Sequence, residues 1–239
     1  MRTWRADVLD GPAEISYRDG PIKRMKFVHG RLVELNGRPM EDLRERIDDS
    51  RIAAELSKQV RLEFVETPIK DAAEYLQDAH NIPIVLDRQV PNVDGPLTDN
   101  LSGLDLQSGL ILLLHDYELA IDYRHGCVWV TPTQDAVNWR DPTGASGIRP
   151  PSGSALALAW NEPQDLKYYK TPLKAALDAL ANSLAIEIDT SQLDPAGHLL
   201  TVNVKGLPLR HALGVVLDRT GCRCKLENGK LFILPPEAP

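Results

Sequence analysis

An internal repeat is the feature that most constrains the fold of this 239-residue chain. Residues 62–76 read LEFVETPIKDAAEYL and residues 166–180 read LKYYKTPLKAALDAL, so the pair Thr67-Pro68 recurs as Thr171-Pro172 at an offset of 104. The likeness continues toward the end of the chain with offsets between 102 and 104. Two copies of one unit of about 70 residues are therefore present, near 60–132 and 165–235.

Each copy has the pattern of a small α+β unit. The alternating run Leu62–Val65 predicts a strand. Thr67-Pro68 then predicts an N-cap hydroxyl followed by proline at the first helical position. A helical stripe, a buried strand, a strand ending at Gly103, a second leucine-rich helix and a closing hairpin follow. The predicted order in each copy is β-α-β-β-α-β-β.

The whole chain is predicted to be α+β, with two tandem short domains preceded by a small β-meander and a connecting helix. The first repeat is expected at 59–133 and the second at 165–239. Residues 1–58 show short alternating runs broken by X-Gly pairs, and then a charged stretch with helical spacing. Residues 134–164 are expected to be a linker, because Asp141–Ser154 is dominated by proline, glycine and serine.

The repeat resembles a known family. Its strand, its Thr-Pro helix, its apolar strand ending in aspartate, its Leu200–Gly206 segment (LTVNVKG) and its closing hairpin are similar to the secretin and TonB N-terminal short domain, the unit that forms the first periplasmic domain of bacterial secretins. The resemblance covers about 145 residues in two copies. It implies a non-enzymatic protein–protein interaction or assembly module of bacterial envelope secretion or signalling machinery, located in the periplasm or cell envelope.

The resemblance also implies docking by exposed sheet edges, which suit strand addition. We therefore expect the third strand of each copy, together with the adjoining first strand, to bind protein partners, including further copies of this chain. The predicted partner-binding residues are Leu97, Asp99 and Leu101 in the first copy and Leu200, Val202, Val204 and Lys205 in the second.

Charge and hydropathy exclude some other partners. The net charge is −7 and the pI is about 5.4, so the chain has no global attraction for nucleic acid. No stretch approaches the roughly 20 apolar residues of a membrane span, so direct membrane insertion is not expected. The first 20 residues lack the apolar core of a signal peptide, which leaves a cytoplasmic adaptor as an alternative.

The charge is unevenly distributed between the copies. Residues 59–132 carry 4 basic and 12 acidic side chains, whereas residues 166–239 carry 9 basic and 7 acidic ones. One interpretation is that this difference in charge is random variation on solvent-exposed faces and has no function. A sharper hypothesis is that the acidic first copy packs against a basic surface, on the second copy of a neighbouring molecule or on a partner.

The sequence contains few candidates for chemistry. Cys222 and Cys224 align with apolar positions of the first copy and are expected to be buried filler, whereas Cys127 aligns with Lys230 and is expected to be exposed. Asp87 and Asp189 recur at a strand end, where a carboxylate typically caps a turn.

The six histidines have no metal-binding spacing, and no nucleophile motif is present. We therefore expect no catalytic residue, cofactor or metal, and no enzyme. Two alternatives stay open: a small-ligand-binding protein using the cleft between the repeats, and an uncharacterised hydrolase.

Overall fold

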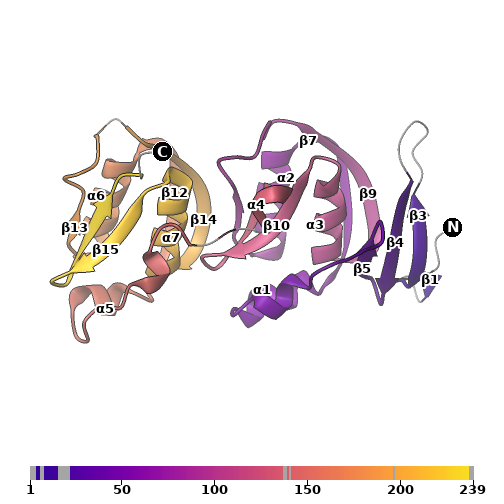
Figure 1. Ribbon diagram of the computed structural model, residues 1–239, viewed down its shortest axis with the longest axis horizontal. Helices are drawn as coiled ribbons and strands as arrows, with labels where there is room; N and C mark the ends of the chain where they lie inside the picture. Colours follow the sequence, from indigo (N-terminus) through magenta and orange to yellow (C-terminus); the bar gives the residue numbers. More distant parts are fainter. Residues whose placement is uncertain are drawn as a thin grey trace. The chain divides into compact units, whose positions relative to one another are not determined.

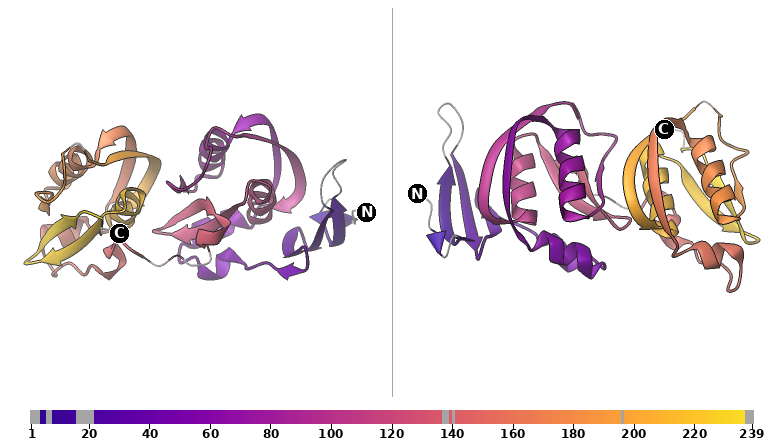
Figure 2. Two further views of the ribbon diagram at one scale, coloured as in Figure 1. Left: turned by 45° about the horizontal axis from the view of Figure 1, so that its top comes forward. Right: turned by 180° about the vertical axis from the view of Figure 1, so that it is seen from behind.

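The computed structural model describes residues 4–5, 8–15, 22–136, 139, 141–195 and 197–236. The chain divides into two compact units, Met1–Tyr123 with Val128–Ala136 and Arg124–Cys127 with Val137–Pro239. Each unit combines helices with small sheets, so the predicted α+β class is confirmed. Figure 1 and Figure 2 show the elements of each unit.

The first unit begins with the β-meander. Its four-stranded sheet has the order β3-β4-β5-β6, with antiparallel neighbours. Buried and exposed residues alternate along β4, which places Met25 and Phe27 in the core. The strands are β1 (Trp4–Arg5), β2 (Val8–Leu9), β3 (Gly11–Ile15), β4 (Lys23–Val28), β5 (Arg31–Leu35) and β6 (Arg38–Pro39).

The connecting segment is helical over a shorter range than its charge pattern suggested. It forms a 3-10 turn, η1 (Leu43–Arg46), and a helix, α1 (Ser50–Leu56). Both begin at an aspartate, because the carboxylates of Asp42 and Asp49 accept backbone N–H groups of the first turn. These two caps interrupt the segment and explain why one continuous helix does not form.

The two repeats have the same order of elements. The first contains β7 (Gln59–Pro68), α2 (Ile69–His80), β8 (Ile84–Leu86), β9 (Pro96–Asp105), α3 (Leu106–His115), β10 (Leu119–Arg124) and β11 (Cys127–Pro132). The second contains β12 (Pro163–Pro172), α6 (Leu173–Leu184), β13 (Ile188–Asp189), β14 (Leu199–Pro208), α7 (Leu209–Thr220), β15 (Arg223–Glu227) and β16 (Lys230–Leu234). The order β-α-β-β-α-β-β is thus confirmed in both copies.

Each repeat contains a long two-stranded ribbon and a three-stranded sheet. The ribbons are the antiparallel pairs β7–β9 and β12–β14. The sheets have the orders β10-β11-β8 and β13-β16-β15, in which β8 and β11, and likewise β13 and β16, are parallel. Helices α2, α6 and α7 contact both the ribbon and the sheet of their own repeat. Helix α3 contacts its ribbon, and its leucines line a small cavity together with Val130 of β11, so the core lies between these layers (Figure 1).

The helix that follows each Thr-Pro pair begins differently from the prediction. Helix α2 starts at Ile69 with Pro68 as its N-cap, and no side chain caps it. The hydroxyl of Thr67 instead donates to the carbonyl of Val65 at 3.3 Å. The first helical N–H group donates to the carbonyl of Gly95 at 3.0 Å. A carbonyl from the loop before β9 therefore replaces the expected hydroxyl cap.

Most of the segment expected to be a linker packs against the second repeat. Its first residues belong to the first unit as part of α4 (Thr133–Ala136), and the rest contains the 3-10 turn η2 (Ala145–Gly147) and α5 (Ala155–Ala159). Ile148 and Leu156 are buried, and the N–H group of Cys224 in β15 donates to the carbonyl of Thr143 at 2.8 Å. A few apolar side chains within a proline- and glycine-rich stretch are sufficient to fold it onto the repeat.

Candidate protein-docking surface

The predicted docking strands place most of the predicted side chains in the core. Leu97, Leu101, Leu200, Val202 and Val204 are all at most 7% exposed. They point inward because successive residues of a strand face opposite sides of the ribbon. Any docking at β9 or β14 therefore uses backbone groups or the outward-facing neighbours of these residues.

The two polar residues of the predicted set lie differently. Asp99 is half-buried at an inward register position opposite Phe64, where its carboxylate accepts the N–H group of Asn100 at 2.8 Å. Lys205 is exposed and faces outward from β14. Of the predicted docking side chains, Lys205 is therefore the one that belongs to an exposed residue.

A bulge interrupts both ribbons at the same place. The register shifts between Phe64 and Thr67 in β7 and between Tyr168 and Thr171 in β12. A bulge of this kind adds unpaired residues to one strand and redirects its side chains. Because it recurs in both copies, it belongs to the repeat itself.

Both bulges contain a residue other than glycine in the left-handed backbone region. Glu66 has φ 49° and Lys170 has φ 47°. The N–H group of Glu66 donates to the hydroxyl oxygen of Thr98 at 2.9 Å, and that of Lys170 donates to the hydroxyl oxygen of Thr201 at 3.0 Å. A threonine of the partner strand thus stabilises a conformation that ordinarily favours glycine.

The bulges present apolar side chains to solvent. Val65 is 73% exposed and Tyr169, at the equivalent position, is 75% exposed. Leu199, opposite Pro172 on the neighbouring strand, is 59% exposed. None of these residues was among the predicted docking residues, although strict alternation after Leu62 and Leu166 places Val65 and Tyr169 on the outward face.

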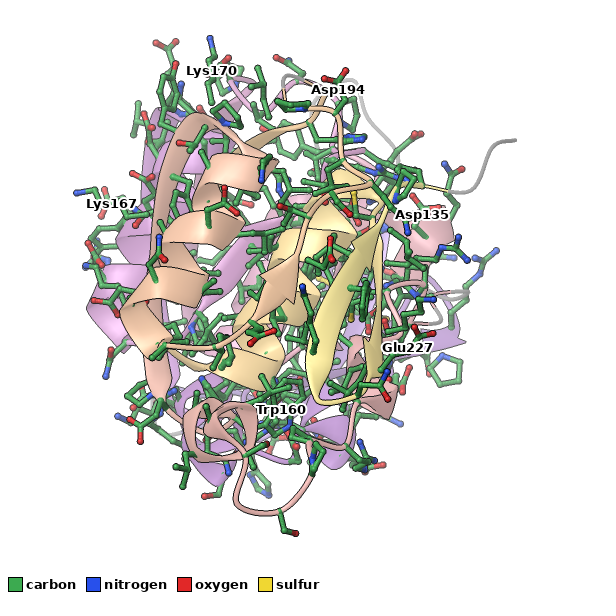
Figure 3. The ribbon with its side chains drawn as sticks, turned by 90° about the vertical axis from the view of Figure 1, so that its left-hand side faces the viewer. Asp135, Trp160, Lys167, Lys170, Asp194 and Glu227 are labelled. Carbon is green, nitrogen blue, oxygen red and sulfur yellow. The ribbon has the colours of Figure 1, made fainter. Side chains whose placement is uncertain are left out.

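Lysines surround the exposed tyrosine of the second repeat. Lys167, Lys170 and Lys205 are exposed, and the Lys170 ammonium lies 5.4 Å from the centre of the Tyr169 ring. Figure 3 shows Lys167 and Lys170 pointing away from the body of the second repeat. We call the residues Lys167, Tyr169, Lys170, Leu199 and Lys205 the basic ribbon face.

The matching face of the first repeat has the opposite charge. Glu63 and Glu66 are exposed beside Val65, at the positions equivalent to Lys167 and Lys170. Arg61 lies 3.2 Å from the Glu63 carboxylate and offsets part of its charge. We call Glu63, Val65 and Glu66 the acidic ribbon face.

The outer edges of the two ribbons have different surroundings. In the first unit, β2 and β5 contact β9, and the N–H group of Asp105 donates to the carbonyl of Gly30 at 3.0 Å. The elements packed most closely on β14 are β12, α6 and α7. On that side Arg219 donates to the carbonyl of Thr201 at 3.1 Å. The meander therefore covers part of the β9 edge, whereas at β14 the Arg219 side chain of α7 binds the carbonyl of Thr201.

The cysteines form no reactive site. Cys222 and Cys224 are buried, as expected, and Cys127 is buried as well, which corrects the expectation of an exposed thiol. The prediction of an exposed Cys127 is wrong because most residues of β11, including Trp129, are buried. Burial raises the pKa of the Cys127 thiol, and burial together with the nearby charge of Asp141 raises the pKa of Cys224 to about 12.

The recurrent aspartates act as turn caps, as predicted. The carboxylate of Asp87 accepts the N–H group of Gln89 at 3.1 Å, and that of Asp189 accepts the N–H group of Ser191 at 2.9 Å. Hydrogen bonds from Ser191, with a contribution from Lys230, lower the pKa of Asp189 to about 2. The Asp189 carboxylate therefore stays ionised at neutral pH, and both carboxylates cap the backbone of the turn that follows the strand.

Two cavities in the first unit offer about 20 Å³ each. That volume accommodates about one water molecule, and ligand sites are commonly several hundred Å³. Among the described residues, no group of three metal-binding side chains comes together. No described helix is long and apolar enough to cross a bilayer.

Comparison with known proteins gives a faint likeness. No family model and no curated protein matches the chain. Two solved structures of a candidate anti-sigma factor from Parabacteroides distasonis match at 19% identity and a TM-score of 0.27, covering 51% of this chain and 55% and 54% of theirs. The chain thus spans about half the length of the structures it matches. A likeness of this strength carries no argument about function.

Proposed function

We propose that this chain is a non-enzymatic protein-interaction module, and that protein partners dock on the β12–β14 ribbon of the second repeat. The observation that carries the proposal is Tyr169, which is 75% exposed on a bulge beside the exposed Leu199. Aromatic side chains dominate the energetics of protein interfaces because they bury a large area at a small entropic cost.

The surroundings of Tyr169 favour a protein partner over other ligands. Tyr169 and Leu199 project from the outer face of the ribbon and line neither of the two small cavities, whereas a metabolite site is ordinarily concave. Lys167 and Lys170 flank Tyr169, and Lys205 lies farther along β14; charged residues beside an apolar centre are common at docking sites. The outer edge of β14 adds backbone groups that an extended segment could pair with, once Arg219 releases the carbonyl of Thr201.

We further propose that the repeats are related to the secretin and TonB short domains, and that the chain functions in bacterial envelope secretion or signalling, in the periplasm or envelope. The repeated β-α-β-β-α-β-β order and the Thr-Pro and Lys-Gly landmarks support this relation. A cytoplasmic adaptor built from the same unit is the alternative, and fractionation of the native source distinguishes the two.

Photo-cross-linking in the native host tests the docking surface. A photoreactive amino acid is placed at Tyr169 or Lys205, and at Ala179 as the control, because Ala179 is exposed on α6 of the same repeat. We expect one discrete protein adduct from the two ribbon positions and none from Ala179. The absence of adducts at the ribbon, or an equal adduct from Ala179, would overturn the proposal.

A further inference from the structure

We propose that the basic ribbon face of the second repeat binds the acidic ribbon face of the first repeat on a second copy of this chain. The inference rests on the proposed docking role of the β12–β14 ribbon and names its partner. Its starting point is that the two faces occupy equivalent positions of the repeat and carry opposite charges.

The charges are matched residue by residue. Glu63 and Lys167 occupy one equivalent position, and Glu66 and Lys170 occupy the other, each at an offset of 104. Both pairs are exposed. The contrast extends to the whole repeats, since residues 59–132 carry 4 basic and 12 acidic side chains and residues 166–239 carry 9 and 7.

The two faces also have the same arrangement of side chains along the strand. Both ribbons contain ten-residue strands with a bulge between equivalent residues. Each bulge presents one apolar side chain between the two charged positions, Val65 in one face and Tyr169 in the other. Laid face to face, the ribbons would bring Tyr169 onto Val65 and place a lysine opposite a glutamate on either side.

Two other charges moderate the attraction. Arg61 lies beside Glu63 at 3.2 Å. Asp165, at the other end of β12, accepts the N–H group of Gly206 at 2.8 Å. The strand register places Asp165 close to Lys205, so these two charges offset each other and leave Lys167 and Lys170 as the net positive charges of the basic ribbon face. The two faces therefore keep their opposite signs.

The expected contact is weak. A ribbon of ten residues is about 33 Å long at about 3.3 Å per residue, and two strands are about 10 Å wide. A face of this size buries roughly 300 Å² per partner, whereas a stable interface buries about 800 Å². Association should therefore appear at high protein concentration and decline with ionic strength, because the charges are exposed.

The two faces lie on different repeats, so the contact is heterologous. Each molecule carries one face of each kind, so a row of copies leaves a free face at either end and further copies can add, whereas two molecules that pair reciprocally form a closed dimer. Open addition would raise the average mass continuously with protein concentration, and a reciprocal dimer would give a plateau at twice the monomer mass. Either result supports the contact.

Complementary charge reversal tests the inference. One variant carries Lys167→Glu with Lys170→Glu, and the other carries Glu63→Lys with Glu66→Lys. Each is followed by sedimentation velocity, alone and in a 1:1 mixture, at ionic strengths of about 0.01 M and about 1 M, where the Debye length is about 30 Å and about 3 Å. Circular dichroism melting curves confirm that each variant is folded.

We expect the unmodified chain to associate at low ionic strength, each variant alone to lose association, and the mixture to recover it. A chain that stays monomeric at every concentration, or variants that associate as the unmodified chain does, would overturn the inference. These results are separable from the cross-linking test. Adducts to a different protein with no self-association would leave the docking role standing and remove the second copy as its partner.

Discussion

Removing the guanidinium group of Arg44 should destabilise the first unit by about 3 kcal/mol. Arg44 retains 15% exposure and binds two carboxylates. Its Nε and Nη2 donate to the two carboxylate oxygens of Asp42 at 2.6 Å and 2.9 Å, and its Nη1 donates to Asp105 at 2.9 Å. Asp105 is 7% exposed on its side chain and caps α3 through the N–H group of Ser108.

The magnitude follows from what the substitution leaves behind. Arg44→Ala leaves the Asp105 carboxylate buried beside no cation, and breaking a buried pair by removing one partner costs about 3–5 kcal/mol. We take the lower end because Arg44 keeps some contact with water. Although burial opposes ionisation, the hydrogen bonds and charge of Arg44 hold the pKa of Asp42 below its usual range, which agrees with a strong pair.

Hydrogen exchange measured by mass spectrometry suits this prediction because it reads each unit separately. A loss of about 3 kcal/mol lowers protection in the most stable amides roughly 150-fold. We expect that fall in peptides from α3 and β9, and no change in peptides from α7 and β14.

Arg31 supplies a matched control. It binds the same Asp42 carboxylate at 2.8 Å, but its side chain is 42% exposed. Arg31→Ala should therefore cost less than about 1 kcal/mol. Equal effects of the two substitutions, or a loss spread over both units, would refute the reasoning from burial.

Three further predictions concern the second unit and the thiols. The buried Cys127, Cys222 and Cys224 should not react with a thiol reagent such as Ellman's reagent until denaturant is added, and rapid labelling of the native chain would contradict their burial. Gly206→Ala should lower the free energy of unfolding by about 1 kcal/mol, although a methyl group there meets only open space, because φ is +68°; urea titration measures this, and an unchanged free energy of unfolding would show that alanine adopts this backbone conformation without strain. Burial opposes ionisation of Asp141, but hydrogen bonds from Ser146 and Thr143 lower its pKa, so its contribution is complete above the unfolded pKa of about 4 and is lost as pH falls through the lower folded value. Thermal melts should show Asp141→Asn less stable than the unmodified chain at pH 6, with the difference shrinking below about pH 4; a difference that is constant with pH would show that titration of Asp141 is not involved.

The order of elements could be predicted because the repeat supplied each signal twice. The helical stripe after Thr67-Pro68 and the turn-capping Asp87 both reappear in the second copy, and each agrees with the structure. Local spacing was enough for these features, since a strand, a helix or an aspartate turn depends on residues a few positions apart.

Features that depend on distant partners could not be predicted in the same way. Helix α2 begins after Pro68 without a side-chain cap. Its first N–H group instead donates to the carbonyl of Gly95, which lies far along the chain. The prediction that Cys127 is exposed was wrong. Its alignment with Lys230 indicates the direction in which the side chain points, but it does not show which other parts of the chain cover that side chain. The outward position of Tyr169 follows from alternation, but the adjoining bulge depends on the hydroxyl of Thr201 in another strand.

The shared bulge has a consequence for how such a chain diversifies. After a duplication, a backbone distortion supported by Thr98 in one copy and by Thr201 in the other leaves the residue beside it free to vary, because that residue is mostly exposed to solvent. Val65 and Tyr169 illustrate this freedom, because they are different residue types at equivalent positions of the same backbone bulge. Selection can therefore exchange the displayed side chain and the flanking charge without remaking the hydrophobic interior, so a single ancestral unit can yield two surfaces of different specificity.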